Sequence, residues 1–180
     1  GYGNAVTTSR DVTDRAYACQ VLLSLCETVG MRLRRDGQAG SCVTIQLRTS
    51  EFETWSHQMR LASATNVTGE LYQAASSLLD QAWDRKTPLR QLGVSVTQLA
   101  DGTLRQYSLF DAADYARQEK LDTAVDALRE KFGEGALFRA ALLHSDERMA
   151  GGLHKKRRTG ITKPIEDEAA RIRKKYGNND

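Results

Sequence analysis

Two stretches of the chain place apolar residues at every third or fourth position, and segments in which apolar and polar residues alternate flank each of them. The first stretch, over 12–35, predicts an amphipathic helix with Asp11 as its N-cap. The second predicts a helix that is capped by Asn66 or Thr65 and stopped by Pro88. Each helix has one apolar side, so each must pack against another element.

The β-branched run Val6-Thr7-Thr8 predicts a short strand, and the alternating segments predict strands at 42–48, 54–61 and 89–99. The order is therefore β-α-β-β-α-β, which predicts an α+β fold built as a two-layer sandwich. Two helices cover one face of a four-stranded sheet, and the other face is left open to solvent. A helical C-terminal tail follows this sandwich.

The open face of the predicted sheet carries small, neutral hydrogen-bonding side chains and a few cations. Its expected members are Thr44, Gln46, Arg48, Thr54, Ser56, Gln58, Arg60, Gly93, Ser95 and Thr97. None of them is a carboxylate, although a solvated sheet face normally carries some. Small side chains let backbone amides approach a phosphate, and Arg supplies charge, so the face is a candidate nucleic-acid surface. An ordinary solvated face is the alternative, and no aromatic pair is placed to stack RNA bases.

Beyond residue 101 the pattern changes. A further amphipathic helix ending at Gly133 is expected, with an apolar stripe formed by Leu121, Val125, Leu128 and Phe132. Asp122 and Asp126 are expected on its solvated side. Residues 151–160 have the composition of a linker. The run Lys155-Lys156-Arg157-Arg158 is either solvated or a non-specific phosphate contact.

Charge and cysteine content exclude several classes of protein. The chain has 26 Lys+Arg against 23 Asp+Glu, a net charge of +3, so any basic surface must be local. No apolar run could span a membrane. The three cysteines, Cys19, Cys26 and Cys42, lack metal-ligand spacing and are expected to be core residues in a reducing cytoplasm. No residues converge as a catalytic or metal site, and the first methionine is Met31, so we expect a non-catalytic piece of a longer protein.

Several motifs stand in order along the chain: Thr7-Thr8-Ser9-Arg10-Asp11-Val12-Thr13-Asp14, Leu33-Arg34-Arg35-Asp36-Gly37, Val43-Thr44-Ile45-Gln46-Leu47-Arg48 and Arg90-Gln91-Leu92-Gly93-Val94-Ser95-Val96. Together they resemble the little-finger domain of Y-family translesion DNA polymerases of the bacterial DNA polymerase IV type. The resemblance covers residues 3–110 closely. It continues into the tail through Glu119-Lys120-Leu121-Asp122 and Leu128-Arg129-Glu130-Lys131-Phe132-Gly133.

The resemblance implies a ferredoxin-like sheet that lies along the template–primer duplex and holds it for a separate palm domain. The metal-binding carboxylates of the palm are not in this sequence, so the resemblance implies no cofactor here and Mg in the full-length polymerase. The DNA-binding residues that it implies are Ser9, Arg10, Thr44, Arg48, Ser56, His57, Gln58, Arg60 and Ser95. Relatives often carry Arg where His57 stands, which leaves open the face of this strand that meets DNA. The alternative is a protein-interaction module that shares the fold without binding DNA.

Gln106-Tyr107-Ser108-Leu109-Phe110 resembles the Gln-Leu-Ser-Leu-Phe peptide by which such polymerases dock on the sliding clamp. An extended peptide would insert Leu109 and Phe110 into an apolar pocket, while Gln106 fixes the register. The alternative is a strand end whose apolar pair packs on the core. The expected organisation is a DNA-binding domain over 1–105, a clamp-binding peptide at 106–110, a helical extension over 111–150 and a basic tail over 151–180.

Overall fold

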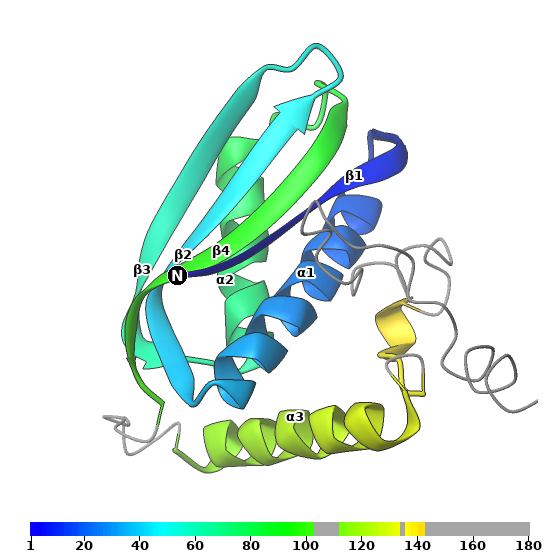
Figure 1. Cartoon of the computed structure of the whole chain (residues 1–180). Coiled ribbons are helices and arrows are strands. Elements are labelled where there is room, and N and C mark those ends of the chain that lie inside the picture. The colour runs from blue at the N-terminus through cyan, green and yellow to red at the C-terminus, as the bar shows by residue number, and fades with distance from the viewer. Residues whose placement is uncertain (103–111, 134–135, 143–180) are drawn as a thin grey trace, which may run out of the picture.

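The structure is a computed structural model that describes residues 1–102, 112–133 and 136–142. Its elements in chain order are β1 (Tyr2–Val12), α1 (Arg15–Arg35), β2 (Gln38–Thr49), β3 (Thr54–Thr65), α2 (Thr68–Ala82), β4 (Leu89–Asp101), α3 (Ala112–Phe132) and a short 3-10 helix (Ala140–Leu142). The predicted order β-α-β-β-α-β and the α+β class are confirmed (Figure 1).

The four strands form one antiparallel sheet in the order β1-β4-β2-β3. Helices α1 and α2 cover one face of this sheet (Figure 1). The core lies between the two layers, and the central strands β2 and β4 contribute the residues Val43, Ile45, Leu47, Leu92, Val94 and Val96 to it. Because these residues alternate along their strands, the residues between them point away from the helices.

The first strand and the first helix cap differ from the prediction. β1 is much longer than 6–8, because it pairs with β4 from Tyr2 opposite Val96 to Thr7 opposite Gln91. The N-cap of α1 is Asp14 rather than Asp11. The Asp14 carboxylate accepts a hydrogen bond from the backbone N–H of Tyr17 at 2.8 Å, which satisfies an amide that the helix leaves unpaired.

Both predicted ends of the second helix were also wrong. α2 starts at Thr68 and its N-cap, Val67, has no capping side chain. Asn66 instead donates from its side chain to the carbonyl of Gln38. The helix ends at Ala82, well before Pro88. It ends there because the backbone of Trp83 is extended, and the indole of Trp83 donates to the carbonyl of Thr87 at 2.7 Å.

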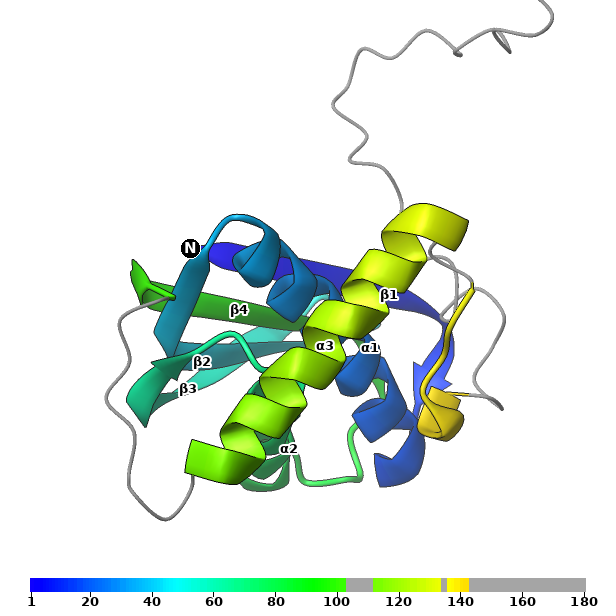
Figure 2. The ribbon, with the colours of Figure 1, turned by 90° about the horizontal axis from the view of Figure 1, so that it is seen from below.

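Helix α3 lies across α1 and the start of α2 (Figure 2). Its buried side was predicted wrongly. The expected apolar stripe is largely exposed, with Leu121 at 58% and Phe132 at 64% of full exposure. The buried residues among the described part of this helix are Tyr115, Asp122 and Arg129, which recur every seven positions on the side next to the expected stripe. Polar contacts, rather than an apolar stripe, therefore join α3 to the sandwich.

The cysteine prediction is confirmed for Cys19 and Cys26, which belong to the core cluster. Burial raises the pKa of the Cys26 thiol above its usual range, so this thiol stays protonated at neutral pH. Cys42 is also buried, but it lies on the outward side of β2. No helix in the described part of the chain is long and apolar enough to cross a membrane.

Candidate nucleic-acid interface

The open face of the sheet is organised as rows of residues that cross the strands. Pairing across β1, β4, β2 and β3 aligns three complete rows, and a fourth row crosses the last three strands. The rows are Gly3-Ser95-Thr44-Gln58, Ala5-Gly93-Gln46-Ser56, Thr7-Gln91-Arg48-Thr54 and Thr97-Cys42-Arg60. All ten residues predicted for this face lie in these rows. None of the row residues is a carboxylate, and two of them are cations.

The open face has a hollow at its centre, because the residues there are glycine and alanine and have no long side chains. A hollow of about 380 Å³ lies over Gly3, Ala5 and Gly93, with Thr44, Gln46 and Ser95 among its lining residues. A Cβ atom added at Gly93 would lie 3.2 Å from the Cβ atom of Ala5. The short side chains therefore leave room for a bulky ligand to approach the backbone, as a phosphate chain must.

Two arginines lie in the two outermost of the four rows. Arg60 is exposed on the edge strand β3, opposite Cys42. Arg48 lies on β2 and is partly buried, with its guanidinium 4.7 Å from the centre of the Phe52 ring. Its Nη1 atom donates to the side chain of Gln91 at 3.5 Å, the long limit of a hydrogen bond. Both guanidinium groups are placed to supply positive charge along the open face.

The structure brings six of the nine DNA-binding candidates together on the open face: Thr44, Arg48, Ser56, Gln58, Arg60 and Ser95. It does not bring His57 to them. His57 pairs opposite Ile45, a core residue, so it lies on the helix-covered side of the edge strand, where its side chain is exposed. The alternation along β3 therefore separates His57 from its neighbours Ser56 and Gln58.

Ser9 and Arg10 also lie outside the rows. They belong to the irregular part of β1 between Thr7 and Val12, where the pairing register with β4 shifts. The Arg10 guanidinium is 4.7 Å from the ring centre of Tyr17, a core residue of α1. Arg10 therefore covers the helix layer rather than the rows.

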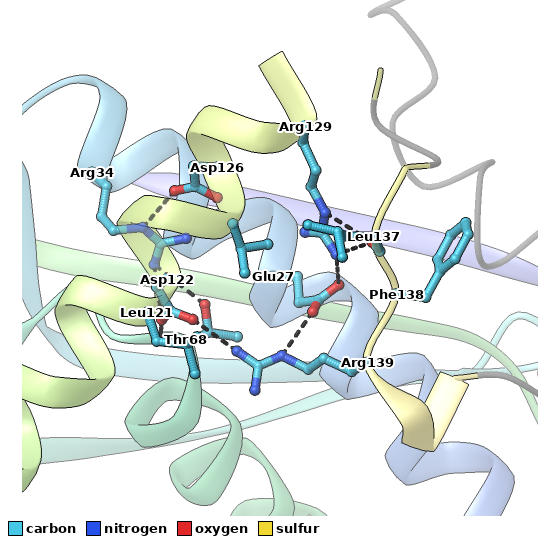
Figure 3. Close-up of a pocket in the computed structure, with 11 residues that line it drawn as sticks. Glu27, Arg34, Thr68, Leu121, Asp122, Asp126, Arg129, Leu137, Phe138 and Arg139 are labelled. Carbon is cyan, nitrogen blue, oxygen red and sulfur yellow. Dashed lines mark hydrogen bonds and ion pairs between the residues drawn. The ribbon is translucent and has the colours of Figure 1, made fainter. Parts of the chain in front are cut away.

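Sequence reasoning missed a largely buried ion-pair network that contacts α3, formed by Glu27, Arg34, Asp122, Asp126, Arg129 and Arg139 (Figure 3). Arg34 of α1 reaches Asp126 at 2.7 Å and Asp122 at 3.2 Å. Arg139 reaches Glu27 and Asp122, each at 2.8 Å. Asp122 and Asp126 were expected to be solvated, so this prediction was wrong.

The network has three acidic and three basic members, so its charges can balance within the protein. Glu27 and Asp122 are almost fully buried, and each contacts two arginines. A buried charge is tolerated only when it is paired, which gives α3 a defined position on the sandwich. The seven-residue spacing of Tyr115, Asp122 and Arg129 is the pattern in the sequence that marks the buried side of α3. A search for apolar periodicity misses it, because two of these three residues are charged.

Residues 106–110, the candidate clamp peptide, and the basic tail over 151–180 lie outside the described residues. The elements on either side of the peptide are described. β4 ends at Asp101 and α3 begins at Ala112. In the described part of the chain, no three His, Cys, Asp or Glu side chains come together as metal ligands.

The model for the impB/mucB/samB family C-terminal domain matches residues 1–109. A DNA polymerase IV of Clostridium acetobutylicum is 34% identical over 145 residues, which cover 81% of this chain and 36% of that protein. A DNA polymerase IV of Moorella thermoacetica is 35% identical over 150 residues, covering 83% of this chain and 37% of that protein. The chain thus spans about a third of the length of these curated relatives.

Among solved structures, a complex of the beta-clamp processivity factor and the little finger domain of PolIV aligns with a TM-score of 0.45 and 19% identity. The alignment covers 60% of this chain and 96% of that one.

Proposed function

This chain belongs to the impB/mucB/samB C-terminal domain family, the little-finger domain of bacterial Y-family polymerases of the DNA polymerase IV type, and from this premise we propose that it binds the template–primer duplex through its open sheet face. In this proposal the domain holds DNA for a polymerase that performs translesion synthesis and DNA repair. The domain contributes no catalytic residue, and the Mg ions bind in a separate part of the polymerase. The whole polymerase acts in the reducing cytoplasm.

One observation carries the proposal. The four rows of the open face contain two arginines, a series of small hydrogen-bonding side chains and no carboxylate. DNA phosphates repel carboxylates and attract guanidinium groups, and binding by phosphate contacts does not depend on sequence. A domain that must accept any template needs this kind of surface.

The sheet supports a shallow contact that follows the backbone of the duplex. Gly3 and Gly93 keep the side chains short at the centre of the face, while Arg48 on β2 and Arg60 on β3 lie in the two outermost rows. A phosphate chain can therefore cross the strands between the two cations, with Thr44 and Ser95 as neutral donors below it. The helix layer plays no part in this contact.

A fluorescence anisotropy titration tests the proposal, with a labelled primer–template duplex and the domain at several salt concentrations. We expect affinity to fall steeply as salt rises, because each phosphate contact releases a counterion. Absence of binding at low salt, or binding that salt does not change, would contradict the proposal and favour a protein-interaction module.

We also propose that Gln106-Tyr107-Ser108-Leu109-Phe110 docks on the sliding clamp. A clamp titration compares the wild-type domain with a double variant, Leu109→Ala with Phe110→Ala. The variant should lose clamp binding, because the apolar pair would fill the clamp pocket, and it should keep duplex binding. Unchanged clamp binding by the variant would assign the clamp contact to another part of the chain.

A further inference from the structure

The open face ends, near the turn between β2 and β3, in a second hollow of about 460 Å³. Residues from three strands and the turn line it, among them Thr7, Asp11, Arg48, Phe52, Arg90 and Gln91. Two of these residues are arginines that come from adjacent strands. The hollow therefore gathers more positive charge than the glycine-floored centre of the sheet.

The guanidinium group of Arg48 lacks a full set of hydrogen-bond acceptors within the described part of the protein. In the described part of the chain its Nε atom is buried and has no acceptor, and its one hydrogen bond is the long contact to Gln91. A buried N–H group without a partner is destabilising, so native proteins rarely keep one unless a ligand or a function uses it. An anion in the hollow would give this guanidinium the acceptor that it lacks.

Phe52 contacts that guanidinium from a strained backbone conformation. Its ring lies 4.7 Å from the Arg48 guanidinium, yet 74% of the residue is exposed. Its φ angle is 70°, in the left-handed region that residues with bulky side chains rarely adopt. A strained aromatic residue exposed beside a cation adds little to the core, which points to a role in binding.

Arg90 reaches the same hollow because of a bulge. Arg48 pairs with Gln91 but Thr49 pairs with Leu89, so Arg90 is an extra residue in β4. Its contacts to the Asp11 carboxylate and the Ser9 carbonyl, at 3.5 and 3.4 Å, are long. Among the described residues, Asp11 is the one carboxylate that lines the hollow, and it offsets part of the charge of Arg90.

We propose that this hollow is a phosphodiester subsite of the open face, with Arg48 and Arg90 as its cations and Phe52 as the positioning residue that holds Arg48. The proposal rests on the function proposed above and adds the residue Phe52 to it. A phosphate oxygen accepts hydrogen bonds from the guanidinium groups, while Phe52 keeps Arg48 from turning into solvent.

The test measures duplex affinity of the wild type, Phe52→Ala, Phe52→Trp and Arg48→Ala by fluorescence anisotropy at several salt concentrations. Phe132→Ala is the matched control, because Phe132 is also exposed but lies on α3. We expect Phe52→Ala to weaken binding about threefold to tenfold, and Phe52→Trp to restore it, because Trp also supports a cation–π contact. Phe132→Ala should bind as the wild type does.

The double variant Phe52→Ala with Arg48→Ala separates positioning from a direct contact. If Phe52 acts through Arg48, the double variant should bind no more weakly than Arg48→Ala alone. Thermal unfolding should be nearly unchanged in Phe52→Ala, which excludes a loss of fold. Wild-type affinity in Phe52→Ala, or additive losses in the double variant, would overturn the inference. Failure of the wild type itself to bind DNA would overturn the proposed function instead.

Discussion

The carboxylate of Asp122 on α3 accepts a hydrogen bond from the backbone N–H of Thr68 at 2.8 Å and so caps a helix that has no cap of its own. Thr68 is the first residue of α2, and an unpaired amide there would be destabilising. The same carboxylate contacts Arg34 and Arg139. The extension beyond β4 thus takes part in the stability of the sandwich.

Replacing Asp122 should therefore destabilise the whole domain. We expect Asp122→Ala to lower the free energy of unfolding by about 3 kcal/mol, because it leaves Arg34 partly unpaired in a buried site and removes the cap of α2. Urea denaturation measures this change. Asp114→Ala is the control, since Asp114 is exposed on the same helix, and its effect should stay within about 0.5 kcal/mol. Equal effects would mean that the network contributes nothing.

A second ion pair, between Arg15 of α1 and Asp80 of α2, predicts a pH dependence of stability. Hydrogen bonds from Arg15 lower the pKa of Asp80 to about 2, with a smaller contribution from Arg85. Because the folded-state pKa lies below the ordinary value of 3.8, the stabilisation is complete above about pH 5 and is lost as the pH falls through 3.8 toward 2. Both side chains of the pair are partly exposed, so solvent screening keeps this contribution small.

Chemical denaturation of the wild type and Asp80→Asn at several pH values measures this pH dependence of the free energy of unfolding. The difference in unfolding free energy should be largest near neutral pH and should shrink below about pH 4. A difference that stays constant down to pH 2 would show that Asp80 contributes through neutral hydrogen bonds alone.

Arg60 should contribute one phosphate contact to duplex binding. For Arg60→Ala we expect weaker binding and a slope of log affinity against log salt that is smaller by about 1. Arg35→Ala serves as control, because Arg35 is an exposed arginine at the end of α1, away from the rows. An unchanged salt slope in Arg60→Ala would remove this residue from the interface.

The sequence predicted the open face well because one rule determines it. Alternation along a strand assigns a face to each residue, so Val43 and Ile45 on the inside place Thr44 and Gln46 on the outside. The same rule places His57 on the other side, with Trp55 and Met59. The family predicted from the motifs is confirmed by the match over residues 1–109.

The ion-pair network could not be predicted in the same way. Periodicity identifies an apolar stripe, but it does not show whether Asp122 meets water or Arg34, which is 88 positions away in the chain. The cap of α1 at Asp14 depends on backbone angles, and the cap of α2 at Thr68 depends on a contact from α3. Sequence patterns therefore could not predict which residue caps either helix. Local patterns determined the sandwich, whereas long-range polar partners determined how α3 lies on it.

The central claim is that DNA meets the sheet face because the four rows of this face lack carboxylates, and a matched pair of substitutions tests it. Ser56→Glu adds a carboxylate to the open face, and Ser77→Glu adds one to the exposed side of α2; both serines are exposed. We expect Ser56→Glu to weaken duplex binding roughly tenfold at low salt and Ser77→Glu to leave it almost unchanged, because a carboxylate repels a phosphate only where the two meet. Equal losses in the two variants, or a larger loss in Ser77→Glu, would contradict the claim.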